Sequence, residues 1–398
     1  MKKTIILFAV AALVAACTPK VKTYDSYEGL VMCGYQGWHD CEGDGADRDW
    51  GHYVPDHGYF GPEHCKIDVW PETSEYEKLY ETGFKYADGT TAYIQSPYDY
   101  STVDTHFRWM QEYGIDGVFM QRFIGYTSNP KLNNHFNTIL SHAKTAANKY
   151  QRAYAVMYDL SGYHEGHDQY LLDDIMKLAE EHQMFDHKAN PSYLYENGKP
   201  LVCVWGVGFT DREGYGIDEA FSIVNGLKER GFSVMLGVPT YWREMKKDTR
   251  NDPRFHELLA QCDVIMPWFV GRYNNETFDS FKGNIKDDIK WAEEHNIGYA
   301  PLCYPGFSWD NLNPGANSLI PRRGGEFFKR QLDWSIECGA KMIYVAMFDE
   351  VDEGTAIFKI ARKIPVTDTR IKFVPLDDEA DSDTWLKLAG EAAAKLKK

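Results

Sequence analysis

Four carboxylates follow directly on an apolar run near the C-terminal end of the chain. The run extends from Met342 to Phe348, and Asp349, Glu350, Asp352 and Glu353 come next. Cleavage of a glycosidic bond needs one carboxylic acid to protonate the leaving oxygen and a second carboxylate near the anomeric carbon. Glu350 and Glu353 are three residues apart, so one turn can present both to the same side. Their crowding is expected to raise the pKa of at least one of them. Glu-x-x-Glu alone is more often a solvated acidic turn, so a catalytic role depends on whether the motif lies at the end of a strand in an active site.

A repeated pattern supplies the elements that position these acids. After residue 100, helix-period segments end near a Gly and a short apolar run follows, as expected for helices that lead into buried parallel strands. Eight strands are predicted, beginning near Val31, Ile115, Arg152, Pro200, Ser233, Asp263, Gly298 and Met342. Seven helices are predicted between them, at Thr102–Tyr113, Asn133–Lys149, Tyr170–His182, Ile217–Arg230, Asp252–Gln261, Thr277–His295 and Arg323–Cys338, and Asp383–Leu396 is the candidate for the eighth. Eight alternating units predict a (β/α)8 TIM barrel, an α/β fold.

The first two strands are separated by an enlarged insertion, from Asp40 to about Pro97. In a barrel this insertion follows a strand, so it emerges on the C-terminal face and is expected to wall one side of the cleft. Four histidines lie in or beside it, at His39, His52, His57 and His64, without the i, i+4 spacing of a helical metal site. No metal and no cofactor are predicted. No Gly-x-Gly-x-x-Gly follows the first strand, which argues against a dinucleotide site.

The strand ends are the next source of site residues, because barrel enzymes place their sites there. Six of the eight ends offer a Trp or a Tyr, whose rings pack against the C–H faces of sugars. Each ring either contacts the sugar or only packs against the protein, and the sequence leaves both roles open. Likewise, Arg122 and Asp159 either bind substrate or form a structural ion pair with each other. The predicted substrate-binding residues are Tyr35, Trp38, His39, Gln121, Arg122, Tyr158, Asp159, Trp205, Tyr241, Trp242, Trp268, Tyr304, Trp309 and Asp349.

The N-terminus has the pattern of a secretion signal. Lys2 and Lys3 precede an apolar core, and Leu13-Val14-Ala15-Ala16-Cys17 resembles a bacterial lipobox. The resemblance implies cleavage before Cys17, lipidation of its sulfur and a membrane-anchored lipoprotein of the cell envelope, on the periplasmic side or the cell surface. The predicted segments are a signal peptide (1–16), a tether (17–28), the barrel (29–365) and a C-terminal segment with a surface helix (366–398).

The net charge limits the classes of ligand that the protein is expected to bind, and the cysteines raise the question of a disulfide. A net charge of −16 argues against nucleic acid, which needs concentrated Lys and Arg, and favours neutral or cationic ligands. A carbohydrate substrate, as the strand-end aromatic residues suggest, and a monomeric protein are expected. Cys41 and Cys65 lie in a polar loop, and whether they pair is left open.

The acidic stretch also resembles a known family. Glu350-Val-Asp-Glu353-Gly-Thr355 is similar to the Glu-x-x-Glu-Gly-Thr signature of glycoside hydrolase family 99, retaining endo-α-mannosidases and endo-α-mannanases with a (β/α)8 barrel, to which the family 71 α-1,3-glucanases are related. Tyr98–Val118 and Gly34–Trp38 resemble the segments at the family's second and first strands.

The resemblance implies an unusual route through a 1,2-anhydro sugar. Glu350 would deprotonate the sugar's own 2-hydroxyl, and Glu353 would act as acid and then as base. The family usually has Asn-Glu-Trp-His-Glu where this chain has Asp349-Glu350-Val351-Asp352-Glu353, so a sugar other than mannose is compatible with the site. Two alternatives stay open: a non-catalytic surface glycan-binding protein, and a conventional two-carboxylate glycosidase, xylosidase- or arabinosidase-like, that uses Asp159 with Glu350.

Overall fold

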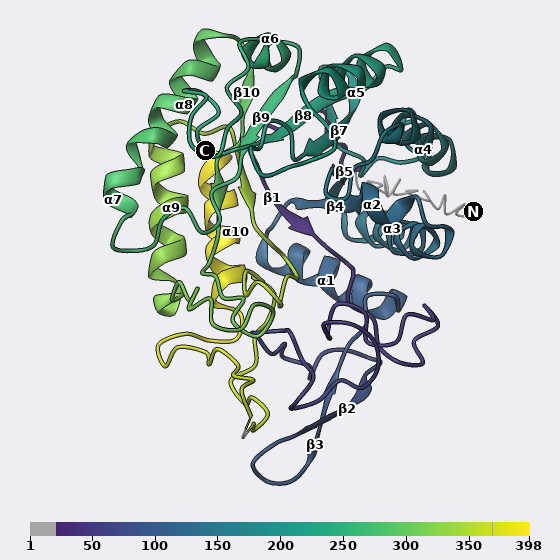
Figure 1. The fold of residues 1–398 in the computed structure, drawn as a ribbon, viewed down its shortest axis with the longest axis vertical. Helices are drawn as coiled ribbons and strands as arrows, with labels where there is room; N and C mark the ends of the chain where they lie inside the picture. Colours follow the sequence, from purple (N-terminus) through teal and green to yellow (C-terminus); the bar gives the residue numbers. More distant parts are fainter. Residues whose placement is uncertain (1–20, 368) are drawn as a thin grey trace, which may run out of the picture.

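The computed structural model describes residues 21–367 and 369–398, and it confirms the predicted (β/α)8 barrel (Figure 1). Eight parallel strand positions are hydrogen-bonded in chain order. They are β1 (Leu30–Tyr35), β4 (Gly117–Phe123), β5 (Ala153–Asp159), β7 (Lys199–Trp205), β8 (Ser233–Val238), β9 (Val264–Pro267), β10 (Gly298–Tyr299) continued by β11 (Leu302–Cys303), and β12 (Met342–Val345). A short strand, β6 (Tyr195–Glu196), pairs antiparallel with β7.

The barrel closes through its divided seventh strand. β10 pairs with β9, and β11 pairs with β12. Between them, the Ala300 N–H donates to the Ile265 carbonyl at 2.9 Å, and the Pro301 carbonyl accepts from the Tyr344 N–H at 3.0 Å. Pro301 has no N–H to give to a ladder, which accounts for the break in a strand that was predicted as continuous.

The helices lie outside the strands, near their predicted positions (Figure 1). Two predicted helices differ from the structure. The segment predicted as Asp252–Gln261 is helical only at α6 (Phe255–Leu259). The one predicted as Thr277–His295 is divided into α7 (Phe278–Phe281) and α8 (Gly283–Glu294), and between them the Lys282 carbonyl accepts from the Trp334 indole at 2.9 Å. The helices are α1 (Tyr100–Tyr113), α2 (Ile124–Thr127), α3 (Pro130–Tyr150), α4 (His167–His182), α5 (Ile217–Glu229), α6 (Phe255–Leu259), α7 (Phe278–Phe281), α8 (Gly283–Glu294), the 3-10 turn η1 (Arg323–Gly325), α9 (Glu326–Glu337) and α10 (Thr384–Leu396).

Glycines end the helices that lead into strands, as the sequence pattern predicts. Gly114, Gly231 and Gly339 follow α1, α5 and α9 with φ values of 85°, 89° and 87°. This left-handed backbone is accessible to glycine without steric cost. The Gly114 N–H donates back to the Met110 carbonyl at 3.0 Å, which satisfies one of the last carbonyls of α1.

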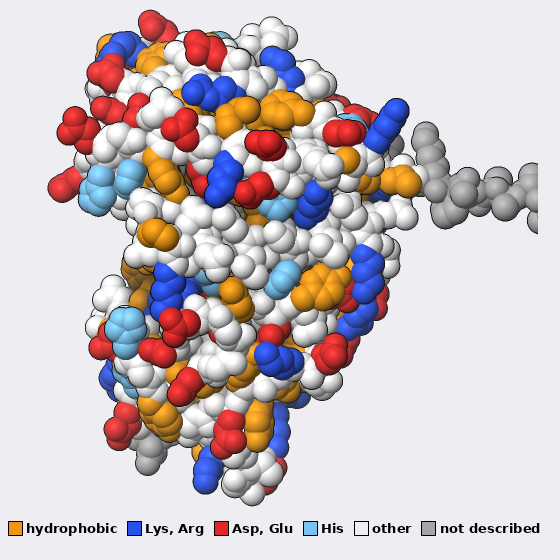
Figure 2. Space-filling model, turned by 90° about the vertical axis from the view of Figure 1, so that its right-hand side faces the viewer, with side chains coloured by type: hydrophobic (Ala, Val, Ile, Leu, Met, Phe, Trp, Pro, Cys, Tyr) orange, Lys and Arg blue, Asp and Glu red, His pale blue; other side chains and the backbone are white. Residues whose placement is uncertain are grey.

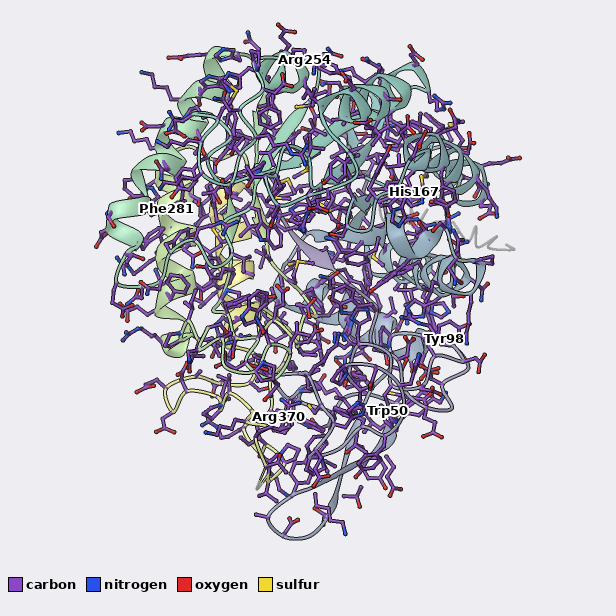
Figure 3. The ribbon with its side chains drawn as sticks, in the orientation of Figure 1. Trp50, Tyr98, His167, Arg254, Phe281 and Arg370 are labelled. Carbon is purple, nitrogen blue, oxygen red and sulfur yellow. The ribbon has the colours of Figure 1, made fainter. Side chains whose placement is uncertain are left out.

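The insertion after β1 forms a small lobe with the C-terminal tail, at the lower end of Figure 1. It contains an antiparallel hairpin that the sequence did not predict, β2 (Tyr80–Lys85) and β3 (Thr91–Ile94). Isolated bridges join Lys85 to Val366 and Pro71 to Ile360, so the tail and the insertion hold each other. Aromatic side chains fill the lobe, among them Trp50, which is labelled in Figure 3. Cys41 and Cys65 are buried here as free thiols.

The last helix, α10, buries one face, which includes Trp385, Leu386 and Ala389. It packs against α9, α1 and β1 and takes the place of the eighth barrel helix, so it is more than a surface element. Cys17 lies outside the described residues. Among those residues, no helix is long and apolar enough to cross a membrane. On the face in Figure 2, acidic and basic side chains are interspersed, without the broad basic patch that nucleic acid would require.

Candidate active site

A cavity of about 620 Å³ opens at the carboxyl ends of the barrel strands. Its walls come from the ends of six strands or from residues just after them, from the loops that follow, and from the insertion, as expected for a barrel enzyme. The lining residues are Gln36, Trp38, His52, Lys66, Gln121, Phe123, Gly125, Tyr126, Met157, Asp159, Ser161, Gly162, His164, Trp205, Arg212, Trp268, Leu312, Met347, Asp352 and Glu353. His52 and Lys66 come from the insertion, which therefore walls one side of the cavity as predicted.

The structure brings part of the predicted set to this cavity. Trp38, Gln121, Asp159, Trp205, Trp268 and Glu353 line it. His39 and Glu350 lie against Asp352, behind the wall. The other predicted residues do not line it: Tyr35, Arg122, Tyr158, Tyr241, Trp242, Tyr304, Trp309 and Asp349.

Arg122 forms a structural ion pair, though not with Asp159. Its guanidinium donates to both oxygens of Asp174 on α4, at 2.8 to 3.0 Å. The Tyr158 hydroxyl donates to the same carboxylate at 2.6 Å. Arg122 and Tyr158 are register partners on β4 and β5, and both point outward to the helix layer. They connect β4 and β5 to α4, and neither of them lines the cavity.

Several predicted aromatic contacts are packing contacts instead. Tyr35 and Tyr304 are buried, with hydroxyls bonded to His106 and to the Tyr273 carbonyl. Trp242 is buried against Trp291, and its indole N–H donates to Asp288. The rings of two further residues are half-buried away from the cavity: Tyr241 lies under the Lys247 ammonium and Trp309 packs against Phe307.

The rings that do face the cavity form two groups. Trp38 stacks on His52, with 3.9 Å between centroids and 5° between planes, and on Phe123 at 4.7 Å. Trp205 and Trp268 meet edge to face at 5.2 Å. Both groups line the cavity beside polar residues, a combination that suits sugar rings.

Asp349 fixes the loop that carries Trp38. Its two carboxylate oxygens accept from the backbone N–H groups of Gln36 and Gly37, each at 2.8 Å. Burial raises the pKa of this carboxyl to about 6, against the opposing effect of the two N–H donors. Asp349 is thus a positioning residue behind the cavity wall.

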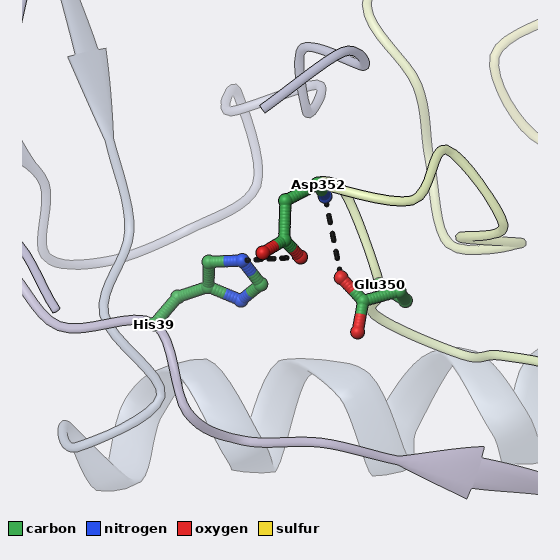
Figure 4. Close-up of side chains that lie close together, drawn as sticks. All are labelled: His39, Glu350 and Asp352. Carbon is green, nitrogen blue, oxygen red and sulfur yellow. Dashed lines mark hydrogen bonds and ion pairs between the residues drawn. The ribbon is translucent and has the colours of Figure 1, made fainter. Parts of the chain in front are cut away.

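Asp352 is the centre of a charged network (Figure 4). Its Oδ2 lies 3.0 Å from the Lys66 ammonium, and its Oδ1 lies 3.6 Å from His39 Nε2. Lys66 also donates to His52 Nδ1 at 3.1 Å. Burial lowers the pKa of His52 to about 4, so His52 is neutral and able to accept this bond. The pKa of Asp352 lies well below its usual range, because Lys66 and the neighbouring donors outweigh the effect of burial.

Glu350 lies directly behind Asp352 and is 1% exposed. Its Oε1 accepts from the Asp352 N–H at 3.2 Å, and its buried Oε2 has no hydrogen-bond partner. Burial, followed by the charge of Asp352, raises the pKa of Glu350 well above its usual range. Ligand atoms of His39, Glu350 and Asp352 lie within 4.8 Å of one another, as in a potential metal site, but the Lys66 ammonium already supplies a positive charge to Asp352.

Glu353 is the member of the acidic stretch whose pKa suits proton donation near neutral pH. Burial, with the nearby charges of Asp352 and Asp159, raises its pKa to about 7. The turn is held by backbone bonds, including Ala356 N–H to the Glu350 carbonyl at 2.7 Å and Ser308 N–H to the Glu353 carbonyl at 3.0 Å. A half-protonated carboxyl at neutral pH is unusual and is a common property of general acids.

Sequence reasoning missed the cations and most loop residues of the cavity. Lys66 and Arg212 lie in segments without periodicity, and no spacing signal ties either to the acids. The four histidines gave a partial signal, because His39 and His52 lie within 4 Å of Asp352 while His57 and His64 lie beside Asp49 and Asp56 instead.

Comparisons with known proteins agree with the fold. The sequence matches no protein-family model and no curated protein. The structure is similar to two structures of the GH99 endo-α-mannosidase from Bacteroides thetaiotaomicron, one of them in complex with bis-tris propane. For both, the TM-score is 0.67 at 16% identity over 94% of this chain and 98% of the other. It is also similar to a glycoside hydrolase-like protein, with a TM-score of 0.53 at 13% identity over 82% of this chain and 94% of that one. At such identities, the likeness establishes the barrel fold.

Proposed function

We propose that the protein is a glycoside hydrolase that cleaves a poly- or oligosaccharide, with Glu353 as its general acid/base. The observation that carries the proposal is a carboxyl with a pKa of about 7 in an aromatic-lined cavity at the carboxyl end of a barrel. The acid form of Glu353 is available near neutral pH to protonate a leaving oxygen. The similarity of fold to a GH99 endo-α-mannosidase supports the same class of reaction.

The first step of the proposed reaction forms a 1,2-anhydro sugar. Glu350 takes the proton of the sugar's 2-hydroxyl, the resulting oxygen attacks the anomeric carbon, and the bond to the leaving oxygen breaks as Glu353 protonates that oxygen. In the second step, Glu353 removes a proton from water, which opens the anhydro ring at the anomeric carbon. The proton on Glu350 returns to the 2-oxygen, and the anomeric configuration is retained. Both carboxyls end in their starting states.

The position of Glu350 sets a requirement for this route. Its Oε2 has no partner within the described residues and is therefore free to accept a hydroxyl proton. It lies behind Asp352, so the 2-hydroxyl must reach it past the Asp352 side chain. Its raised pKa also makes it a strong base once it is ionised.

A conventional two-carboxylate route is the second candidate, because Asp159 lines the same cavity as Glu353. Burial raises the pKa of Asp159, and its charge is close enough to raise the pKa of Glu353. In that route a second carboxylate acts directly at the anomeric carbon or activates a water there.

Purified protein tests the proposal when it is incubated with α-mannan, α-glucan, xylan and arabinan and its products are analysed. Release of new reducing ends from at least one glycan is expected. Binding without cleavage of any glycan would favour a glycan-binding protein instead.

The pH dependence is expected to separate the two routes. The conventional route needs Glu353 protonated beside an ionised Asp159, so its kcat/KM is expected to fall as pH rises through about 7, by about tenfold per unit above that value. The anhydro route also needs Glu350 ionised, and the pKa of Glu350 is raised well above its usual range by burial, so its kcat/KM is expected to fall as pH drops below about 7 and to hold just above that value. A rate profile from pH 5 to 9 checks both, and a profile without any change between these limits would contradict the role of Glu353 in either route.

We also propose that the mature protein is a monomer anchored in the cell envelope through a lipid on Cys17. The basic residues, the apolar core and the small residues before Cys17 support the lipid anchor. Wild-type protein expressed with radiolabelled palmitate is expected to incorporate label and to fractionate with membranes. Cys17→Ser should do neither, and a labelled Cys17→Ser protein would contradict the assignment.

A further inference from the structure

Arg212 is a cation in the cavity wall that the proposed chemistry does not use. It belongs to the loop between β7 and α5, and it lines the cavity together with Asp159 and Glu353. Its guanidinium lies over the Trp205 ring at 5.2 Å and the Phe209 ring at 5.7 Å. The stacking fixes the plane of the guanidinium and leaves its N–H groups for another partner.

Within the described part of the chain, Arg212 makes no ion pair; burial raises the pKa of the nearby Asp159, and the charge of Arg212 only partly offsets that effect. The Arg212 Nε is buried and makes no hydrogen bond, and its exposed sequence neighbours Asp211 and Glu213 form no ion pair with it. Lys66, the other cation of the cavity, is 3.0 Å from Asp352 and is already neutralised. A buried donor without a partner carries a desolvation cost, which a ligand acceptor would remove.

The loop that carries Arg212 is held in place by Arg250. The Arg250 side chain donates to three backbone carbonyls of this loop: Phe209 at 2.8 Å, Tyr215 at 3.0 Å, and Arg212 itself. The Arg250 N–H also donates to the Gly208 carbonyl at 2.8 Å. Because the loop is ordered before ligand arrives, little of the binding free energy is lost in ordering it.

We propose that Arg212 binds an anionic substituent, a carboxylate or a sulfate ester, on the sugar that occupies the cavity beside Asp159 and Glu353. This inference rests on the proposed function and specifies the substrate as an acidic glycan, such as one that contains uronic acid or sulfated residues. A planar guanidinium is suited to two parallel hydrogen bonds with either group. The selection of an acidic glycan is not implied by the fold.

The net charge of −16 does not oppose this binding at the distance that matters. Charges further away than about 8 Å are largely screened at physiological ionic strength, so the nearest groups decide. Those are Asp159, Glu353 and His164 in the same wall, and Asp211 and Glu213, which adjoin Arg212 in the chain but are exposed to solvent. Glu353 is about half-protonated at neutral pH, and Asp159 accepts from the Ser161 N–H at 2.7 Å, which draws part of its charge away from the cavity.

Calorimetric binding to a Glu353→Gln protein tests the inference without any hydrolysis. The probes are tetragalacturonate for the carboxylate, a sulfated carrageenan tetrasaccharide for the sulfate, and mannotetraose as a neutral sugar. In the same background, Arg212→Gln is expected to weaken binding of at least one acidic probe by about 10- to 100-fold and to change any neutral binding by less than about threefold. Arg212→Lys, which keeps the charge and loses the fork, should give an intermediate loss.

Arg254→Gln is the matched control. Arg254 is exposed beside α6, at the top of Figure 3, where it pairs with Asp218 and Asp252. Arg254→Gln changes the net charge by the same amount as Arg212→Gln, and it should leave the affinity for every probe unchanged. The inference is overturned if neither acidic probe binds, or if Arg212→Gln weakens neutral and acidic probes equally. If the inference fails in this way but the wild-type protein cleaves a neutral glycan, the proposed function stands. If Arg212→Gln loses binding of an acidic probe but the wild-type protein cleaves no glycan, only the proposed function is overturned.

Discussion

Glu353→Gln is expected to lower kcat/KM for the natural glycan by about 10²- to 10⁴-fold and to leave glycan affinity within a few-fold of wild type. Gln has the shape of Glu and keeps polar contacts, but it has no proton to give to a leaving oxygen. The measurement is the rate of reducing-end release, together with calorimetric binding to the inactive variant. Loss of binding to the same extent as turnover would indicate a structural role instead.

Glu293→Gln provides the control for the change of charge. Glu293 is exposed at the end of α8, and it lies outside the cavity. Its substitution is expected to leave both rate and affinity unchanged. Equal activity of Glu353→Gln and Glu293→Gln would remove Glu353 from the mechanism.

Glu350→Gln separates the two catalytic routes when it is compared with Asp159→Asn. The anhydro route predicts a loss of about 10²- to 10⁴-fold for Glu350→Gln, because an amide cannot take the 2-hydroxyl proton, and a loss below about tenfold for Asp159→Asn. Gln at 350 keeps a carbonyl oxygen that can accept from the Asp352 N–H, so the turn should fold. The comparison uses kcat/KM for both variants on one substrate.

The opposite ranking would support the conventional route through Asp159. A substrate without a 2-hydroxyl gives an independent check, because only the anhydro route requires that group. The wild-type enzyme should not cleave the 2-deoxy analogue of its substrate if Glu350 acts as proposed. Cleavage of that analogue would contradict the role of Glu350 while leaving Glu353 as the acid.

The barrel could be predicted from the sequence because its signals are local. Gly114, Gly231 and Gly339 mark helix ends through their own backbone preference, and the strands that follow are continuous apolar runs. The division of the seventh strand also has a local cause, since Pro301 has no N–H for the ladder, but the prediction did not use it. The lobe that contains the hairpin Tyr80–Ile94 depends on contacts with distant segments, such as the bridge between Lys85 and Val366, and a sequence pattern carries little of that information.

The site was predicted less well, for a reason visible on two strands. Successive side chains in a strand point to opposite faces, so neighbours cannot both face the cavity. Gln121 and Asp159 point inward, whereas Arg122 and Tyr158 point outward to Asp174. Both members of each pair were predicted as site residues, because sequence alone does not fix which face of a strand end points inward.

The acidic turn shows the same limit on a shorter scale. The three-residue spacing predicted that Glu350 and Glu353 would face one sugar together, and only Glu353 lines the cavity. Asp352 takes the place between them, because Lys66 and His39 from far along the chain hold it there. Whole-molecule charge had likewise favoured neutral or cationic ligands, while Arg212 supplies a local cation.

The most direct test of the central claim compares two leaving groups on one sugar. In a 2,4-dinitrophenyl glycoside of the sugar that the enzyme cleaves, the dinitrophenolate leaving group departs without protonation. Loss of the acid should therefore matter little for this substrate. Since kcat/KM reports the steps up to bond cleavage, Glu353→Gln is predicted to retain at least about a tenth of wild-type kcat/KM on this substrate and to lose about 10²- to 10⁴-fold on the natural glycan. An equal loss on both substrates would contradict Glu353 as the general acid.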